Sequence, residues 1–144
     1  MKLVAILENG ELEEQYQIDD FVTEVCKATS EMYSESGFVR PWIGYLAVEE
    51  KTVVGTCAFK SKPVNDRVEI AYFTFPGNEN RGLATEMAKQ LVATGKKEHP
   101  KLTIFAQTLP ENNASTKILE KLQFKKARTI NHPKDGDVWE WELT

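Results

Sequence analysis

The stretch from Val68 to Lys97 constrains the fold more than any other part of the chain, because its apolar residues change period within it. Alternating β-branched and aromatic residues over Val68–Phe73 predict a strand, which Pro76-Gly77 ends. From Gly82 onward the apolar residues recur at helical spacing, and Gly95 is the predicted end of that helix. They are Leu83, Ala84, Met87, Ala88, Leu91 and Val92. The sequence therefore predicts a strand, a polar turn and an amphipathic helix in direct succession.

A turn that leads from a strand into a helix N-terminus can bind an anion. The first N–H groups of a helix have no acceptor within it, and the helix dipole places partial positive charge there. Gly82 lacks a Cβ, so a phosphate oxygen can approach its backbone closely, and Arg81 adds a full charge. The alternative is a plain strand–helix unit in which Gly82 only relieves the turn. Short glycine motifs recur by chance, so the physics alone leaves both interpretations open.

Length and composition indicate one globular domain over residues 1–144. The chain is 41% hydrophobic and 28% charged, which is ordinary for a globular protein. A net charge of -4 argues against a nucleic-acid partner, which calls for a basic face. No apolar run approaches membrane-spanning length, and Met1–Leu7 is too short for a signal peptide. We therefore expect a cytoplasmic protein with no membrane partner.

The cysteine and histidine content predicts no metal site. Cys26 and Cys57 belong to no paired motif, and His99 and His132 are the only histidines. Cys26 falls on a helix face and Cys57 within a strand pattern, so both are predicted to be buried free thiols.

The rest of the chain predicts further strands and helices around this central unit. Short connections make the three strands before the central helix antiparallel, and the strand after that helix is parallel to its partner by the right-handed crossover rule. Asn112 or Asn113 would cap the last helix. The predicted strands are Lys2–Leu7, Trp42–Val48, Thr52–Lys60, Leu102–Gln107, Phe124–Ile130 and Val138–Leu143, and the other helices are Ile18–Ser34 and Asn112–Leu122.

Several segments carry a family resemblance. Asn80–Glu86 reads NRGLATE, and with Glu79 it resembles a pyrophosphate loop of the form Gln/Arg-x-x-Gly-x-Gly/Ala. VEIAY at Val68–Tyr72 resembles a VEIGY strand, and NNASTKILEKLQF at Asn112–Phe124 resembles the motif N-x-x-S-x-x-x-L-E-K-x-G-F. The hairpin at Pro41–Lys60 and the end VWEWEL fit the same family. The chain thus resembles the GNAT superfamily of N-acetyltransferases, in the branch containing the ribosomal-protein alanine N-acetyltransferases.

This resemblance implies a single α/β (α+β) domain of the GNAT fold, in which helices flank a central mixed, mostly antiparallel sheet. It also implies transfer of an acetyl group from acetyl-CoA to a primary amine by direct attack in a ternary complex. The loop residues would hold the pyrophosphate, Phe73–Phe75 would lie along the pantetheine arm, and Asn112 would hold a pantetheine amide or cap the helix. The implied coenzyme-binding residues are Phe73, Thr74, Phe75, Arg81, Gly82, Leu83, Ala84, Thr85 and Asn112.

Four positions depart from the family pattern. Glu79 places an acid where a polar or basic residue is usual, and Phe73 stands where small residues are common. Gln123 replaces the usual Gly, which predicts a different backbone in the turn before Phe124. Leu119 stands where many members carry the Tyr that protonates the leaving thiolate.

Two residues are candidates for the proton transfers. Glu69 is a candidate general base, acting directly or through water, and the alternative is an outward-facing acid on a half-exposed strand. Ser115 is the candidate thiolate proton donor because it matches the branch motif. Its alternative is a first-turn serine that hydrogen-bonds to the backbone.

The sequence does not name the acceptor. A protein N-terminus and a small amine are both open, and so is a coenzyme-A-binding module without transfer activity. Acids gather in Glu8–Asp20, beside the first helix, where they would attract a cationic acceptor. A homodimer is allowed but not predicted.

Overall fold

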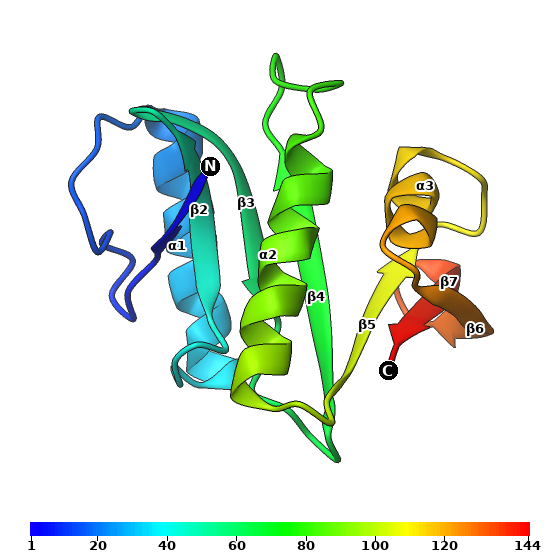
Figure 1. Ribbon diagram of the computed structural model, residues 1–144. Helices are drawn as coiled ribbons and strands as arrows, with labels where there is room; N and C mark the ends of the chain where they lie inside the picture. The colour runs from blue at the N-terminus through cyan, green and yellow to red at the C-terminus, as the bar shows by residue number, and fades with distance from the viewer.

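The computed structural model describes residues 1–144 as a seven-stranded mixed sheet with three helices packed on it (Figure 1). The strands lie in the order β1-β2-β3-β4-β5-β7-β6, which confirms the predicted α/β fold with a mostly antiparallel sheet. In chain order the elements are β1 (Lys2–Ala5), α1 (Asp20–Ser36), β2 (Gly44–Glu49), β3 (Thr52–Phe59), β4 (Arg67–Thr74), α2 (Leu83–Glu98), β5 (Thr103–Thr108), α3 (Ala114–Lys121), β6 (Lys125–His132) and β7 (Gly136–Leu143).

The helices cover both faces of the sheet. The largest apolar cluster lies between the sheet and α2, where Met87 and Leu91 pack with Ile70 and Ile104. A smaller cluster lies under α1 on the other side, and Figure 1 shows α1 behind β2 and α2 in front of β4. Both faces are thus closed by helices over the amino-terminal half of the sheet.

The strand directions follow the predicted pattern. β1 to β4 are antiparallel neighbours, and β5 is parallel to β4 after the crossover through α2. The parallel ladder is short: it runs from Arg67↔Thr103 to Glu69↔Phe105 and stops there. Beyond this point β5 continues to pair with β7 while β4 continues to pair with β3 (Figure 1). The sheet is therefore parted between the upper ends of β4 and β5.

Gly95 does not end the central helix, so that prediction is wrong. α2 continues to Glu98, and Gly95 is buried within it. A Cβ at this position would lie 3.3 Å from Leu102 and 3.4 Å from Ile104 and Phe59. The glycine is needed for close packing of the helix on the sheet rather than for a left-handed cap.

The first helix also begins later than predicted. The Asp19 carboxylate accepts a hydrogen bond from the Val22 N–H at 2.9 Å, so the helix starts at Asp20 and Ile18 precedes it. Phe21 is 46% exposed, so it does not belong to the buried face of the helix. Gly37, at φ +84°, is the C-cap that ends the helix.

Cys26 and Cys57 are both buried and free, as predicted. None of the three helices combines the length and the hydropathy that crossing a bilayer requires. No three side chains among the His, Cys, Asp and Glu residues gather as metal ligands.

Candidate active site

The parting of β4 and β5 leaves backbone groups of β4 without strand partners. The Lys60 N–H donates to the Glu69 carbonyl and the Phe75 N–H to the Val54 carbonyl, each at 2.9 Å. Because backbone groups alternate sides along a strand, those of Tyr72 and Thr74 point away from β3, toward the space that β5 has left. This edge can offer N–H donors and carbonyl acceptors to an extended ligand.

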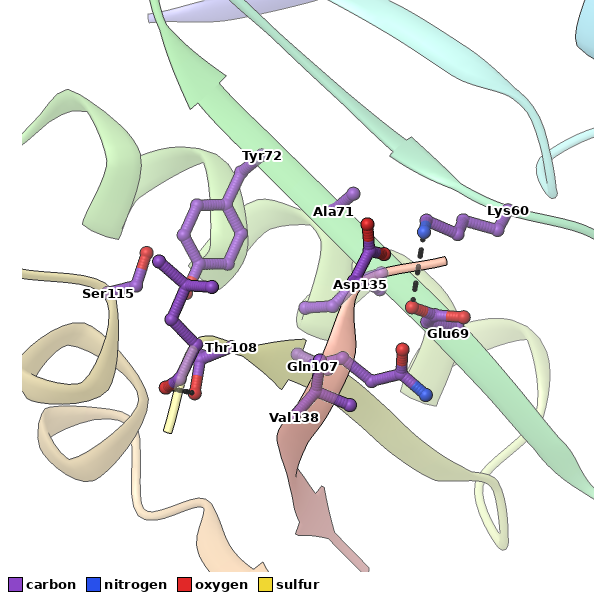
Figure 2. A pocket seen from close by; sticks show the side chains of 12 residues that line it. Lys60, Glu69, Ala71, Tyr72, Gln107, Thr108, Ser115, Asp135 and Val138 are labelled. Carbon is purple, nitrogen blue, oxygen red and sulfur yellow. Dashed lines mark hydrogen bonds and ion pairs between the residues drawn. The ribbon is translucent and has the colours of Figure 1, made fainter. Parts of the chain in front are cut away.

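A first cavity of about 380 Å³ opens between the parted strands. We call it the inter-strand cavity. Glu69 and Tyr72 of β4, Gln107 of β5, Ser115 of α3 and Asp135 are among the residues that line it. Figure 2 shows the Tyr72 ring and Ser115 on one side, and Asp135 with the Lys60–Glu69 ion pair on the other. The walls therefore offer hydroxyls on one side and charged groups on the other.

A second cavity of about 410 Å³ lies at the amino end of α2, and we call it the helix-terminus cavity. Phe73 and Thr74 of β4 form one wall, the turn and first residues of α2 (Gly82–Thr85) another, and α3 a third. Tyr72 and Ser115 line both cavities, and no other residue does. The two spaces therefore meet at these two side chains.

The amino end of α2 is free to bind an anion. Gly82 is its N-cap at φ +75°, and no side chain caps the helix. The first hydrogen bond into the helix runs from the Glu86 N–H to the Gly82 carbonyl, so the three N–H groups before Glu86 have no acceptor in the protein. A Cβ at Gly82 would meet nothing within 4 Å, so the left-handed backbone, not crowding, calls for glycine. This cradle fits the pyrophosphate of a coenzyme.

Two charged residues of the turn, Arg81 and Glu79, are held by other groups of the protein. Arg81 forms an ion pair with Glu49 at the end of β2 and donates to the Asn78 side chain at 3.3 Å, so it is not part of the cavity wall. The Glu79 carboxylate accepts the Gly77 N–H at 2.8 Å and does line the cavity. Arg81, the cationic residue expected at the cradle, is therefore paired with Glu49 and does not line the cavity.

The remaining predicted coenzyme residues are divided. Gly82, Leu83, Ala84 and Thr85 lie together with Phe73 and Thr74 around the helix-terminus cavity. The Phe75 side chain is buried in the apolar cluster under α1, away from that cavity. Asn112 is exposed and lines neither cavity.

The cap of α3 resolves the choice between two asparagines. The Asn113 side chain accepts the Thr116 N–H at 3.1 Å, and the Thr116 hydroxyl accepts the Asn113 N–H at 2.9 Å. This capping box satisfies the first turn without Asn112 or Ser115. The Ser115 hydroxyl is therefore available to the cavities rather than to the backbone cap.

The candidate proton-transfer groups differ in environment. The Glu69 carboxylate lies 3.3 Å from the ammonium of Lys60, the residue that follows β3. Burial raises the pKa of Tyr72 to about 12, and the neighbouring Ser115 hydroxyl opposes that shift. Leu119 is fully buried in the core, so α3 presents no tyrosine hydroxyl from that position.

The acidic segment Glu8–Asp20 lines neither cavity, so the acceptor wall expected there is not found. It lies beside β1 at the far edge of the sheet (Figure 1). Two of its acids are paired, Glu13 with Arg40 at 3.1 Å and Glu14 with Lys2 at 2.7 Å.

The residues of the inter-strand cavity that the sequence did not predict include Lys60, Gln107 and Asp135. Lys60 lies directly opposite Glu69 across β3 and β4, so a register for that hairpin would have found it. The alternation of side chains along β5 could identify Gln107 as a cavity residue only if the parting of β4 and β5 were already known. Asp135 lies in a loop that carries no recognisable motif.

The comparisons with known proteins agree with this geometry. A family model described as acetyltransferase (GNAT) domain matches residues 6–125 of the chain. The chain therefore belongs to the GNAT acetyltransferase family and is an N-acetyltransferase. A comparison with proteins of curated function finds no match.

Solved structures share the fold at low sequence identity. An N-acetyltransferase from Staphylococcus aureus Mu50 has a TM-score of 0.66 at 21% identity, over 84% of this chain and 76% of its own. RimL, the ribosomal L7/L12 alpha-N-protein acetyltransferase, in complex with coenzyme A, has a TM-score of 0.68 at 12% identity, over 88% and 73%. The yncA protein from Salmonella typhimurium, with its cofactor acetyl-CoA, has a TM-score of 0.62 at 18% identity, over 91% and 76%. At these identities the likeness shows the fold.

Proposed function

We propose that the protein transfers the acetyl group of acetyl-CoA to a primary amine by direct attack within a ternary complex. The observation that carries this proposal is the meeting of the two cavities at Tyr72 and Ser115, beside the parted strands. The helix-terminus cavity takes the coenzyme and the inter-strand cavity takes the amine. Such an arrangement brings both reactants together without a covalent enzyme intermediate.

The coenzyme is held mainly by backbone groups. The N–H groups of Leu83, Ala84 and Thr85 bind the pyrophosphate, and the α2 dipole adds to this attraction. Phe73 and Thr74 lie along the pantetheine arm, where the free edge of β4 offers N–H and carbonyl groups. Acetyl-CoA supplies the acetyl group as a reactive thioester.

The chemistry then needs three kinds of group from the protein. Backbone N–H groups at the free edge of β4 stabilise the negative charge that develops on the carbonyl oxygen. Glu69 accepts the proton of the attacking ammonium, directly or through water. A hydroxyl where the cavities meet returns a proton to the leaving sulfur, and Ser115 is the candidate from the sequence motif.

The acceptor is a peptide N-terminus or a small amine. Glu69 and Asp135 in the wall outnumber Lys60, which favours a cationic amine over an anionic one. The likeness to RimL, which is named as a protein N-terminal acetyltransferase, supports the peptide class. A coenzyme-binding module without transfer would leave the inter-strand cavity and its charged wall without a role.

Coenzyme binding is tested by thermal unfolding with and without acetyl-CoA. The wild-type protein should melt at a higher temperature with acetyl-CoA, because the ligand binds the folded state. Gly82→Asp should abolish this rise, because a carboxylate would occupy the phosphate position. Gly77→Asp, in the same turn and also at positive φ, is the matched control and should retain the rise. Equal stabilisation of both variants would contradict the proposed cradle.

Transfer is tested with a mixed panel of peptides, polyamines and amino acids. The best acceptor should be cationic, and its KM should rise with salt while kcat holds, because the Debye length shortens. An anionic best acceptor, or a KM that ignores salt, would show that the charged wall does not select the substrate. Coenzyme binding without turnover of any amine would contradict the transferase proposal itself.

A further inference from the structure

Tyr72 and Ser115 are the two side chains that line both cavities, and they come from different elements, β4 and α3. A donor thioester in one cavity and an amine in the other must react at their junction. Figure 2 shows the Tyr72 ring extending from β4 into the cavity with Ser115 beside it. The groups at this junction are therefore the ones within reach of the reacting atoms.

We propose that Tyr72 is the catalytic residue that donates a proton to the leaving sulfur, and that Ser115 is a positioning residue beside it. This inference rests on the proposed acetyl transfer and assigns one of its steps. The proposal places the general acid, Tyr72, on a strand of the parted sheet. The α3 position at which many family members carry a proton-donating Tyr is Leu119 in this chain, and Leu119 is fully buried.

The other tyrosines do not compete for this role. The Tyr33 hydroxyl accepts the Gly44 N–H and donates to the Ile6 carbonyl, both at 2.8 Å. The Tyr45 hydroxyl donates to the Pro41 carbonyl at 2.6 Å. Tyr16 precedes α1 and lines neither cavity. Among the four tyrosines, Tyr72 alone presents its ring to both spaces.

The chemistry favours the phenol over the aliphatic hydroxyl of Ser115, because a phenol is the stronger acid. Since burial raises the pKa of Tyr72 to about 12, the phenol carries its proton throughout the neutral range. The amine nitrogen forms a bond to the acetyl carbon and gives up a proton to Glu69 or water. As the carbon–sulfur bond breaks, its electron pair stays on sulfur, and the Tyr72 proton moves to it. Water then returns a proton to the phenolate, so the products are an amide and a thiol.

The first test compares Tyr72→Phe with Tyr45→Phe in the acetyl-transfer reaction. Tyr72→Phe should lower kcat about a hundredfold while KM for acetyl-CoA changes less than twofold, because general acid catalysis typically contributes 10²–10⁴-fold. Tyr45→Phe loses a buried phenol with a similarly raised pKa, about 12, and should keep its kcat. Ser115→Ala should cost about tenfold. A larger loss in Ser115→Ala than in Tyr72→Phe would overturn the assignment.

The second test needs no turnover and uses the affinity for coenzyme A by calorimetry at pH 6 and pH 9.5. A hydrogen bond from Tyr72 to the thiolate should make wild type bind at least fivefold more tightly than Tyr72→Phe at pH 9.5. At pH 6, where the thiol is protonated, the two should agree within twofold. S-methyl coenzyme A, which cannot ionise at sulfur, should bind both equally at both pH values. Equal affinities for coenzyme A at pH 9.5 would overturn the proposal.

These outcomes separate the inference from the function on which it rests. Wild-type protein that binds coenzyme A but acetylates no amine contradicts the transferase proposal, whatever Tyr72→Phe does. Wild-type turnover that Tyr72→Phe retains contradicts only the role of Tyr72. If Tyr72→Phe does not fold, a third test replaces all tyrosines with 3-fluorotyrosine, which lowers the phenol pKa and keeps the hydroxyl. The basic limb of the kcat profile should then move to lower pH, and an unmoved profile would overturn the assignment.

Discussion

At the scale of single residues, Gln123 shows how the backbone accommodates a departure from the family motif. The family pattern has Gly before Phe124, and the replacement predicted a changed backbone. The structure instead keeps Gln123 at φ +71°, in the left-handed region that favours glycine. The turn from α3 into β6 is therefore retained with a residue that fits it less well.

Replacing this residue should stabilise the protein. Gln123→Gly should raise the free energy of unfolding by about 1 kcal/mol, because a non-glycine residue in the left-handed region costs about 1–2 kcal/mol. Lys89→Gly, on the exposed face of α2, is the matched control and should lower it by about 1 kcal/mol. Urea denaturation of both variants checks the opposite signs. Destabilisation by Gln123→Gly would show that the side chain outweighs the strain.

Arg81 is the second residue whose structural position changes its predicted role. The sequence placed it at the phosphate, whereas the structure pairs it with Glu49. Both side chains are more than a third exposed, so this pair adds little to stability. A bound pyrophosphate would have to compete with Glu49 for the guanidinium.

Removing that competition should strengthen coenzyme binding. Glu49→Gln should lower the Kd for coenzyme A severalfold, because Arg81 becomes free to turn toward the anion. Glu50→Gln removes the same charge one residue away, has no ion pair in the structure, and should leave the Kd within twofold. Calorimetry at two salt concentrations measures both. Equal changes in Kd in the two variants would mean that net charge alone, and not release of Arg81, sets the affinity for coenzyme A.

At the scale of elements, local pattern predicted the order of strands and helices, but tertiary packing decided their ends. The short links made β2 to β4 antiparallel and the crossover made β5 parallel, as the structure confirms. The point at which β4 and β5 part was not predictable, because it depends on β5 pairing with β7. The motif predicted Gly82–Thr85 as coenzyme residues, and these residues lie together around the helix-terminus cavity, whereas the position of Tyr72 depended on that parting.

Gly95 gives a test of this packing. A glycine near the end of a helical pattern predicts the end of the helix, but here it allows α2 to lie against Leu102, Ile104 and Phe59. Gly95→Val should lower the free energy of unfolding by about 1–3 kcal/mol through overpacking. Lys89→Val, on the exposed face of α2, should cost less than 1 kcal/mol through helix propensity alone. Thermal or urea unfolding measures the difference, and equal costs would contradict a packing role.

At the scale of the whole molecule, the parted sheet needs a connection besides its short parallel ladder. Arg67 of β4 forms ion pairs with Glu140 and Glu142 of β7, and Arg128 of β6 binds the same two carboxylates. The Arg67 guanidinium also lies 4.7 Å from the centre of the Phe105 ring. This network joins the two halves of the sheet where β4 and β5 pair, next to Glu69 and Gln107 of the inter-strand cavity. It therefore holds the strands together where they pair and leaves them free to part where the site lies.

The amino-terminal edge of the sheet plays no part in that site. The acids of Glu8–Asp20 lie beside β1, and the cavities lie between β4 and β5. We therefore propose that the charged wall of the inter-strand cavity, rather than the acidic segment, selects the acceptor. A cytoplasmic location remains a prediction from the sequence, and a homodimer remains open.

The pH dependence of stability tests the ion-pair network that Arg67 and Arg128 form with Glu140 and Glu142. Hydrogen bonding from Arg67, followed by that from Arg128, lowers the pKa of Glu142 below its ordinary value. A carboxylate with a lowered folded-state pKa stabilises the protein fully above its unfolded pKa, and this stabilisation is lost as pH falls through the folded pKa. Glu142→Gln should therefore melt at a lower temperature than wild type at pH 7, and the two should converge as pH falls from about 4.5 toward 3. Glu120→Gln, on the exposed face of α3, should follow wild type throughout. If the melting temperature of Glu142→Gln stays equally far below that of wild type at pH 3, the shape of the Glu142 side chain, not its charge, holds the two halves of the sheet together.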